Sequence, residues 1–466
     1  MVTSDREERN LIDRLYQRCK RLDDPANTSN IFVGIQTSAD AIYHLTKKGQ
    51  ERYVCTPKGD DAPPPYEVEI EDALMKPLVS GGEAKRYQVP TTDTYLLFPY
   101  IVDEKGAHLI DPATMRVHFP KAWSYLNSYK DDLRLREARW DRDGNLIESP
   151  FDDVQSYRFG RHQNLEKQEL VKLIVAQTVP RMRVCLDESA RFYLNNVRVN
   201  GIIVAGKQDP WFLLGVLNSR VADFVFRRIA KVKDGGYFEA NRQFIAPLPI
   251  PFADEDDLRA VAIRALELQT AHTGRREILI EIERRLSTAR ARNKPETWLF
   301  PSLRSKRDLA TEAPARLDVD KKRAWAEQRY DLELTSFHDA ISARLRPGAP
   351  LSTSFKNGEL TFLIEGVPVV DRIFVDATEG EFIAAQWKVL CSTFSITEGT
   401  DGKRLANALR KIASADNPAL VAQVIEREKK LSVLEESIAV QERELDALIS
   451  RLYGLTEAEL RLIGAN

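Results

Sequence analysis

The sequence predicts a mixed α/β (α+β) domain, followed by two long helices and a small α+β domain inserted between them. Three observations support this fold class. Residues 31–252 hold short strand-like segments separated by turns and polar loops. Residues 254–293 form one uninterrupted helical pattern, acidic at its start and basic at its end, which suits the helix dipole. From residue 418, apolar residues recur at heptad spacing.

The composition is that of an ordinary globular protein. The 466 residues are 43% hydrophobic and 30% charged, and 68 Lys and Arg against 70 Asp and Glu leave a net charge of -2. This balance excludes a wholly basic nucleic-acid binder, although a local basic face remains possible. No apolar run reaches the roughly 20 residues of a membrane helix. The charged start MVTSDREERN is unlike a secretory signal. Four scattered cysteines indicate neither disulfides nor a metal site, so we expect no metal and a cytoplasmic location.

The first half divides into an N-terminal helix and linker (1–30) and the mixed domain (31–252). Residues 6–21 place Leu11, Ile12 and Leu15 on one helical face. One helix is predicted in the mixed domain, at WFLLGVLNSRVADFVFRRIA, and the prolines of APLPIPF end the domain. Its predicted strand-like segments are IFVGIQTSADAIYHL (interrupted by Gly34), EVEIEDALMKPLV, TYLLFPYIV, ELVKLIVAQ and ARFYLNNVRVNGIIVAG.

The second half divides into a spacer helix with its linker (253–300), the small domain (301–416), and a heptad helix with a tail (417–466). Within the small domain AWAEQRYDLELTSFHDAISARL reads as a helix, and GELTFLIEGVPVVDRIFVDA and EFIAAQWKVLCSTFSI read as strands. The heptad helix is predicted to pair either with residues 254–293 as an antiparallel coiled coil or with a second copy of the chain. The expected partner-helix seam is Leu431, Leu434, Ile438, Leu445, Leu448 and Leu452, with Gln441 as one polar position.

A search for catalytic motifs finds little. An adenine methyltransferase needs an [NDS]-P-P-[YFW] tetrapeptide, but Pro63 replaces the hydrogen-bonding residue in PPPY. Glu83-x-Lys85, with Asp60, Asp61 and Asp72 upstream, has the form of a metal-dependent nuclease triplet, which also arises by chance. No phosphate-binding loop, G-x-S-x-G or H-E-x-x-H motif is present. We therefore expect no catalytic residues and no cofactor on this chain.

Charge counted by segment is more informative. Residues 151–250 hold 15 Lys and Arg against 10 Asp and Glu, whereas residues 1–150 hold 21 against 25. Within RFGRHQNLEK, arginine offers the forked donors that pair with guanine, and Asn and Gln offer the amides that pair with adenine. KVKDGGY places cations beside flexible glycines, as phosphate-contacting loops do. The alternative is that both segments are solvated surface loops.

A series of short motifs follows in one order along the chain. The motifs are GIQTSAD, LMKPLVSGGEAKRY, the helix of FPKAWSYLNSYKDDLRLRE, FGRHQNLEKQELVKLIVAQ, FYLNNVRVNGIIV, LLGVLNSRVADFVFRRIA, GGYFEANRQFIAPLPIP and the tail SRLYGLTEAELRLI. This ordered series resembles the TaqI-like target-recognition (specificity) domain of bacterial N6-adenine DNA methyltransferases and restriction–modification enzymes. The resemblance covers residues 31–252 and the C-terminal tail, and residues 300–415 have no such match. Glu83 and Ala84 depart from the polar pair usual in the second motif.

The resemblance implies sequence-specific recognition of double-stranded DNA. The methyltransferase domain that normally precedes this domain is expected to lie on a separate subunit, which would bind S-adenosylmethionine and flip the adenine. The chain would then be a specificity subunit in restriction–modification or phage defence, without a role at a membrane. Predicted base contacts are Gln36, Thr37, Arg161, Gln163 and Asn164. Predicted phosphate contacts are Lys85, Arg86, Arg158, Arg181, Arg228, Lys231 and Lys233.

Three alternatives remain open from the sequence. The chain could be the C-terminal fragment or split half of a fused methyltransferase or restriction enzyme. It could be a nuclease that uses Glu83 and Lys85, or an interaction scaffold that no longer binds DNA. One recognition domain followed by two long helices also resembles half of a type I restriction specificity subunit, in which helical spacers dock the catalytic subunits.

Overall fold

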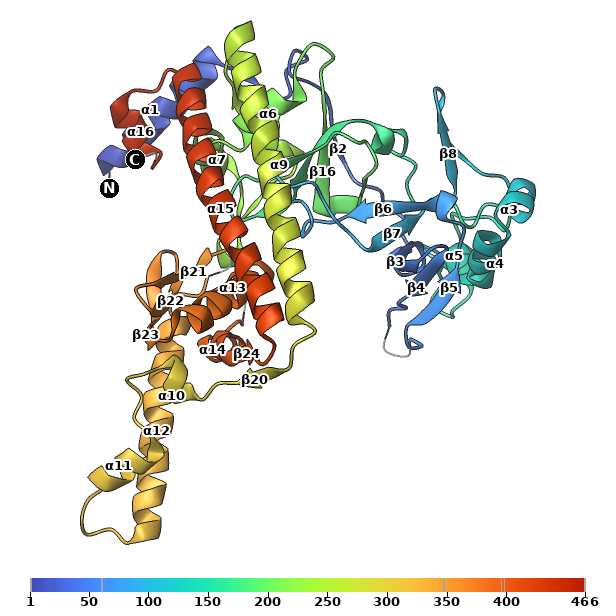
Figure 1. Cartoon of the computed structure of the whole chain (residues 1–466). Coiled ribbons are helices and arrows are strands. Elements are labelled where there is room, and N and C mark those ends of the chain that lie inside the picture. The colour runs from blue at the N-terminus through green and yellow to red at the C-terminus, as the bar shows by residue number, and fades with distance from the viewer. Residues whose placement is uncertain (1, 60–61, 347, 395, 398, 465–466) are drawn as a thin grey trace. The chain divides into compact units, whose positions relative to one another are not determined.

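The computed structural model describes residues 2–59, 62–346, 348–394, 396–397 and 399–464 (Figure 1). The chain folds into two compact units. Unit 1 comprises Met1–Lys231, Phe238–Thr270 and Gln441–Asn466, and unit 2 comprises Val232–Tyr237 and Ala271–Val440. Helices and several sheets are mixed along the chain, which confirms the predicted fold class. In the described part of the chain, no helix is both long enough and apolar enough to cross a membrane.

The first sheet of unit 1 is antiparallel and four-stranded, in the order β14-β12-β16-β2. Every residue of its central strand β12 is buried, which explains the apolar run LIVA that follows Lys172 in this strand. The strands are β2 (Thr28–Val33), β12 (Lys172–Ala176), β14 (Val184–Asp187) and β16 (Val199–Val204).

The second sheet of unit 1 has the order β15-β6-β7-β3-β4-β5, and its β15–β6 pair is parallel. A hydrophobic core that includes Tyr43, Phe98, Tyr125 and Phe159 packs this sheet against short helices. The strands are β3 (His44–Gly49), β4 (Arg52–Cys55), β5 (Tyr66–Glu69), β6 (Met75–Val79), β7 (Thr94–Leu97) and β15 (Tyr193–Leu194). The helices are α2 (Asp40–Tyr43), α3 (Pro112–His118), α4 (Pro120–Ser128) and α5 (Lys130–Leu135).

Smaller elements complete unit 1. The predicted N-terminal helix is α1 (Val2–Arg18), with Leu11 and Leu15 buried and Ile12 half-buried. Short strands pair as β1 (Lys20–Arg21) with β19 (Pro249–Ile250), β8 (Tyr100–Asp103) with β9 (Gly106–Leu109), β10 (Arg139–Trp140) with β11 (Leu146–Glu148), and β13 (Thr178–Val179) with β18 (Tyr237–Glu239). The helices α8 (Arg242–Ile245) and α16 (Glu457–Leu462) also belong here.

The single helix predicted at WFLLGVLNSRVADFVFRRIA is wrong. The segment forms two helices, α6 (Pro210–Leu217) and α7 (Arg220–Ile229). The break falls at Ser219, which is extended (φ -71°, ψ 158°) and accepts a hydrogen bond from the Ala222 amide as the N-cap of α7. A serine that caps a new helix competes with continuation of the preceding one.

Unit 2 contains an antiparallel three-stranded sheet, β21 (Leu351–Lys356), β22 (Glu359–Ile364) and β23 (Val367–Phe374). Its core joins Phe362 to Trp387, whose rings meet edge to face with centroids 5.8 Å apart. The remaining elements are β17 (Val232–Lys233), β20 (Ala291–Asn293), α10 (Glu296–Leu299), α11 (Lys306–Glu312), α12 (Val319–Ser342), α13 (Ala377–Thr393), α14 (Gly402–Arg410) and β24 (Lys411–Ala413).

Two predictions in this region are wrong. EFIAAQWKVLCSTFSI, predicted as a strand, forms most of helix α13 up to Thr393. Asp376 caps that helix, and Ile383 and Trp387, four residues apart, share its buried face. The long helix predicted at 254–293 ends earlier than expected, as α9 (Glu255–Leu286). Residues 291–293 form strand β20 instead, which pairs with β24.

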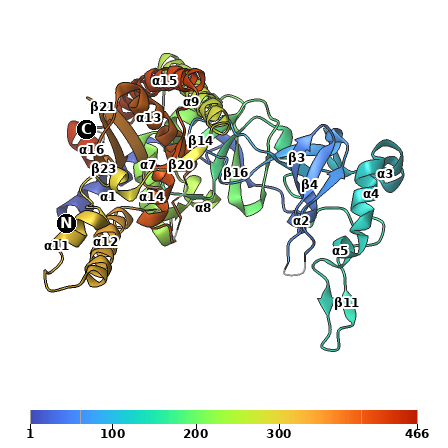
Figure 2. The same ribbon diagram turned by 60° about the horizontal axis from the view of Figure 1, so that its bottom comes forward.

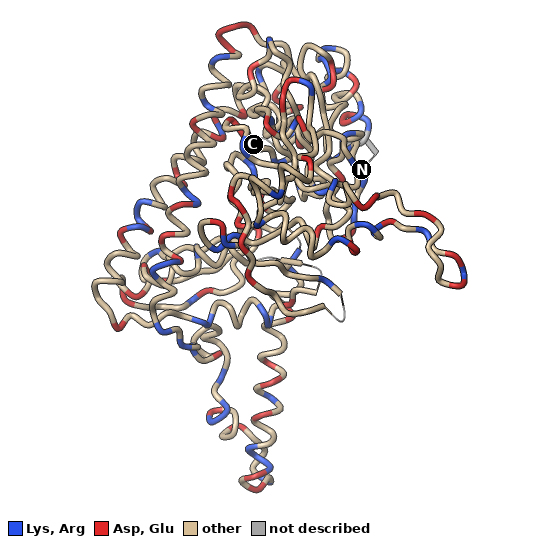
Figure 3. Tube along the Cα trace, turned by 90° about the vertical axis from the view of Figure 1, so that its right-hand side faces the viewer, with Lys and Arg blue, Asp and Glu red and all other residues tan. Residues whose placement is uncertain are grey.

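The helices α9 and α15 (Pro418–Leu452) contribute to both units and run antiparallel in each. In unit 1, Asp257 pairs with Arg451 and Arg264 with Glu444. In unit 2, ion pairs join Arg275 to Glu435 and Glu281 to Arg427. Figure 3 shows acidic and basic residues interspersed along these helices. Of the predicted seam residues, three are buried (Leu431, Ile438 and Leu445) and three are half-buried (Leu434, Leu448 and Leu452).

Candidate functional site

The site is built around two loops of unit 1, residues 34–39 and 160–164, which we call the recognition loops. The first leaves β2 at Gly34, where a Cβ atom would lie 2.3 Å from the Leu194 carbonyl oxygen. Only glycine permits this close approach of two backbones. The next amide, that of Ile35, donates to the same carbonyl at 2.7 Å. The first recognition loop therefore leaves the sheet in a fixed direction.

Backbone hydrogen bonds join the two recognition loops, although more than 100 residues separate them in the sequence. The Gly160 amide donates to the Thr37 carbonyl at 3.0 Å, and the Arg161 amide donates to the Gln36 carbonyl at 3.2 Å. A Cβ atom at Gly160 would lie 2.0 Å from the Ser38 hydroxyl oxygen. The structure thus brings together the two segments that carry all of the predicted base-contact residues.

The five predicted base-contact residues differ in what their side chains can reach. Arg161 and Gln163 are exposed, and Arg161 lies 3.4 Å from Glu137. Gln36 is half-buried. Thr37 is fully buried, and its hydroxyl donates to the Asp40 carboxylate at 2.6 Å.

The Asn164 side chain is half-buried, and its amide nitrogen donates to the Val33 carbonyl at 3.3 Å. Its oxygen accepts a hydrogen bond from Lys167 at 2.8 Å. In this structure Arg161 and Gln163 present their side chains outward, whereas the polar groups of Thr37 and Asn164 hold the recognition loops. A role of the five residues in base contact stays a prediction.

Behind the recognition loops runs a buried polar chain, made of Asn164, Gln168, Lys172 and Asp187. Asn164 has a left-handed backbone (φ 65°), and its carbonyl accepts from the Gln168 side chain at 3.0 Å. The fully buried Gln168 also accepts from the Leu194 amide at 2.9 Å. Because the Leu194 carbonyl accepts from the Ile35 amide, the backbone of Leu194 connects the first recognition loop to the chain, and Asn164 connects the second.

The chain ends in an ion pair that is closed to solvent. Lys172 lies 2.9 Å from Asp187, and both side chains are 0% exposed. The ammonium also donates to the Gln168 carbonyl at 2.7 Å, so its donors are used inside the protein. Burial lowers the pKa of Lys172, against the attraction of Asp187, which raises it. Asp187 in turn accepts from the Phe192 amide at 3.0 Å and thereby fixes the turn before β15.

Gln168, Lys172 and Asp187 were missed as site residues by the sequence reasoning. Lys172 lies within the FGRHQNLEKQELVKLIVAQ motif, but one lysine at the edge of an apolar run usually marks a strand end. The available signal was a lysine at the first position of a strand whose other residues are all apolar, with an acid at the end of a neighbouring strand. Lys172 faces Asp187 in the β12–β14 register.

The predicted phosphate contacts differ in their surroundings. Three of these arginines bind named groups of unit 1. Arg86 pairs with Glu442 and donates to the Asn218 carbonyl, Arg158 donates to the Pro150 carbonyl, and Arg228 lies 2.7 Å from Glu8. Lys85, Arg181 and Lys231 in unit 1 and Lys233 on β17 in unit 2 are exposed, as is Arg228.

In the structure, Glu83 and Asp72 of the predicted nuclease site bind other groups of the chain. Glu83 accepts a hydrogen bond from the Ser80 amide at 2.8 Å, and Asp72 lies 3.1 Å from Lys47. Asp60 and Asp61 lie outside the described residues. Among the residues that the structure does describe, no three His, Cys, Asp or Glu side chains are grouped so that they could hold a metal ion.

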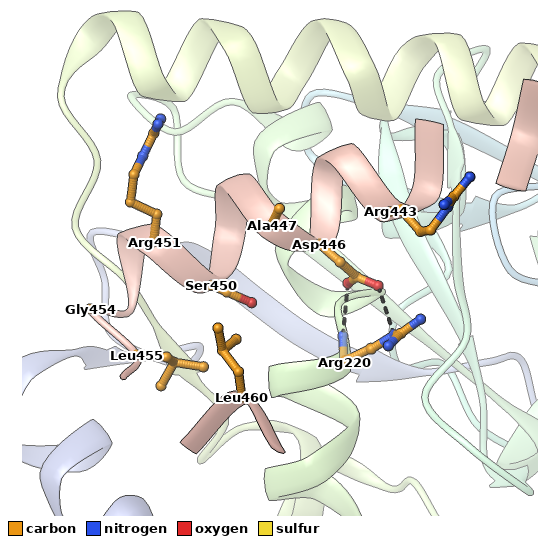
Figure 4. Close-up of a pocket in the computed structure, with 9 residues that line it drawn as sticks. All are labelled: Arg220, Arg443, Asp446, Ala447, Ser450, Arg451, Gly454, Leu455 and Leu460. Atoms are coloured by element: carbon orange, nitrogen blue, oxygen red, sulfur yellow. Dashed lines mark hydrogen bonds and ion pairs between the residues drawn. The ribbon is translucent and has the colours of Figure 1, made fainter. Parts of the chain in front are cut away.

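A pocket of about 610 Å³ lies at the C-terminal end of α15, away from the recognition loops (Figure 4). Arg220 from α7 donates from its backbone amide to Asp446 at 3.1 Å, and its guanidinium lies 3.2 Å from the same carboxylate. Arg451 pairs with Asp257. These arginines are engaged by acids of the chain, so the pocket wall links α7 to α15 rather than displaying free cations. Leu455 and Leu460 supply its apolar side.

Comparison with known proteins finds a family match within the first half of the chain. Residues 76–250 match the family model of the TaqI-like C-terminal specificity domain. The chain is also similar to the type II restriction enzyme and methyltransferase RM.Eco57I of Escherichia coli, with 20% identity over 258 residues. That alignment covers 53% of this chain and 25% of the relative, so the chain spans about a quarter of that enzyme's length.

Residues 76–250 therefore match a TaqI-like C-terminal specificity domain, which confirms, for these residues, the resemblance stated from the sequence. The match includes the second recognition loop and the buried polar chain. The first recognition loop precedes the matched residues and is joined to them by the hydrogen bonds described above.

Proposed function

We propose that this chain reads a short sequence in double-stranded DNA and directs an N6-adenine methyltransferase to it. The observation that carries the proposal is the pair of joined recognition loops, which a buried ion pair supports inside a TaqI-like specificity domain. Reading base edges requires donors held in a fixed geometry, because a bidentate contact tolerates little displacement. A buried polar chain behind exposed Arg161 and Gln163 supplies such a support.

In this proposal Arg161 and Gln163 contact base edges, whereas Thr37 and Asn164 set the shape of the recognition loops. Lys85, Arg181 and Lys231 are the exposed cations of unit 1 that would contact phosphates and produce salt-dependent binding. Arg86 and Arg228 would instead bind acids of the chain.

The methyltransferase would be a separate subunit or domain that binds S-adenosylmethionine and flips the adenine. The paired helices α9 and α15 would dock it. RM.Eco57I, whose name joins a restriction enzyme and a methyltransferase, supports an association of this kind of domain with both activities. The same relative favours a second candidate, in which the chain is one piece of a fused enzyme of that type. In either case the system would serve restriction–modification or phage defence.

Two measurements test the proposal. N6-methyladenine mapped across the genome of the source strain should lose one sequence motif when this gene is deleted. In vitro, Arg161→Ala should weaken binding to a duplex with that motif by about 1–3 kcal/mol and relax the preference at one base pair. Arg259→Ala, an exposed arginine on α9, is the matched control. An unchanged methylome together with no sequence preference in vitro would leave the interaction scaffold as the better account.

A further inference from the structure

A small hairpin of unit 1 has a surface that the proposed function does not yet use. We call β10 and β11, with the turn between them, the 139–148 hairpin; Figure 2 shows it projecting beyond α5. Its turn is internally ordered. Asp141 accepts from the amides of Asp143 at 2.9 Å and Asn145 at 2.7 Å, and Gly144 takes the left-handed conformation (φ 84°) that the turn requires.

The hairpin displays large apolar side chains to solvent. Trp140 is 50% exposed, Leu146 is 40% exposed and Ile147 is 61% exposed. Large apolar side chains are usually buried in a core, but these three, within eight positions of a small ribbon, are not. Such clusters on a surface usually mark a binding site.

Most charged side chains of the hairpin form ion pairs or hydrogen bonds within it. Arg139 pairs with Glu148 across the strands, and Asp141 accepts the hydrogen bonds of the turn. Arg142 and Asp143 then balance one another in charge. The ribbon therefore offers an apolar, nearly neutral surface that neither attracts nor strongly repels a polyanion.

The start of the hairpin is tied to the second recognition loop, and its end is tied to Arg158, two residues before that loop. Glu137, two residues before β10, forms an ion pair with Arg161. Arg136 donates to the Arg158 carbonyl, and its guanidinium stacks on Phe151, 3.9 Å from the ring centroid. A duplex held by Arg161 would therefore lie next to this ribbon.

We propose that the 139–148 hairpin is a second DNA-contacting element, which enters the groove beside the recognition loops and packs Trp140 and Ile147 against apolar base edges. This inference rests on the proposed function. A two-stranded β-ribbon fits the major groove of B-DNA, where the thymine methyl group is the apolar feature of the base pairs. DNA is favoured over a protein because the hairpin lies inside the matched specificity domain and adjoins the loop that carries Arg161. The ordered turn reduces the entropy lost on binding.

The test begins with a duplex that the full chain selects from a random library. The double variant Trp140→Ala, Ile147→Ala should bind this duplex about 10-fold or more weakly, in line with the loss of two good contacts. Both side chains are exposed, so its thermal unfolding should match the unmodified chain. The matched control is Ile263→Ala, Leu266→Ala, two exposed apolar residues on α9 in the same unit, which should bind within about twofold of the unmodified chain.

Replacing thymine by deoxyuridine in the selected duplex removes only the methyl groups. The unmodified chain should lose affinity at one or two such positions, and the double variant should lose nothing more there. A double variant that binds every duplex as the unmodified chain does would overturn the inference. If it keeps full DNA binding but no longer associates with the methyltransferase, the hairpin is a protein interface, and the inference is again wrong. If the unmodified chain selects no duplex at all, the proposed function fails and this inference fails with it.

Discussion

Two regions of this molecule use paired opposite charges at almost the same distance, with different surroundings. In the buried polar chain, Lys172 and Asp187 are 2.9 Å apart and 0% exposed. Between α9 and α15 in unit 2, Arg275 and Glu435 are 2.8 Å apart, with 35% and 29% of their side chains exposed. If one partner of the first pair is removed, the remaining charge has no access to water. Either partner of the second pair can be solvated when the other is removed. Burial, more than distance, decides what each pair does.

The largest expected effect comes from breaking the buried pair. Lys172→Ala leaves the Asp187 carboxylate without its cation and should lower the free energy of unfolding by about 3–5 kcal/mol. Urea denaturation of the two proteins measures the difference. Lys172→Met, Asp187→Leu removes both charges and should be less destabilising than Lys172→Ala alone, although the Phe192 amide then loses its acceptor. A double variant that is worse than the single one would contradict this account.

The second-largest loss of stability is expected at the recognition loops, where Gly160 and Ser38 are in close steric contact rather than paired by charge. Gly160→Ala would place a methyl group 2.0 Å from the Ser38 hydroxyl and should cost about 1–3 kcal/mol of stability. Ser38 itself has a positive φ of 58°, so glycine suits that position as well. Adding Ser38→Gly to Gly160→Ala should therefore restore most of the loss in thermal unfolding. No rescue would mean that the two loops do not approach each other in this way.

A smaller effect is expected in the exposed pair. Arg275→Ala should lower the free energy of unfolding by about 0.2–1 kcal/mol, and the difference should shrink as salt is raised. Lys430→Ala, which removes a pair with Glu426 within one turn of α15, is the control and should change even less. A salt-insensitive loss of several kcal/mol at Arg275 would show that the helix pair depends on buried charge after all.

The smallest effect concerns Glu8, whose pKa is lowered by its hydrogen bond to Arg228. A carboxyl whose pKa is lowered in the folded state stabilises the fold fully at pH values above its ordinary pKa of 4.5. This stabilisation is lost as the pH falls through the lowered pKa. Glu8→Gln should therefore be less stable than the unmodified chain by up to about 1 kcal/mol at pH 7, and the difference should be smaller at pH 3. Denaturation curves at both pH values check this, and a difference that grows toward low pH would contradict it.

The sequence predicted the parts of the fold that a local pattern determines. The unbroken apolar run at residues 173–176 indicated a buried strand, and the heptads of residues 418–452 indicated a long helix. The prediction failed at α13, because Phe382, Ile383 and Trp387 favour strands in isolation while their spacing and the Asp376 cap favour a helix. It also failed at Ser219, where one cap divides a continuous apolar pattern.

For the site, the motifs located both recognition loops but could not show that they are joined. That contact depends on the backbone of Leu194 and on Gly34 and Gly160. At both glycines a side chain would clash with a neighbouring segment, but only in the folded protein. The buried polar chain was hidden for the same reason. A lysine and an aspartate 15 residues apart become a pair only through the register of β12 against β14.

The antiparallel course of α9 and α15 also bears on which segments of this chain could be exchanged or deleted in evolution. In unit 2 the end of α9 and the start of α15 meet, with Arg285 donating to Gln423 at 3.1 Å, and β20 pairs with β24 just beyond. A segment whose two ends are already adjacent can be exchanged, enlarged or deleted by closing one short loop, at little entropic cost. The segment between β20 and β24 is thus placed as a replaceable module, and a chain cut back to a tight turn at this point could keep residues 31–252 intact.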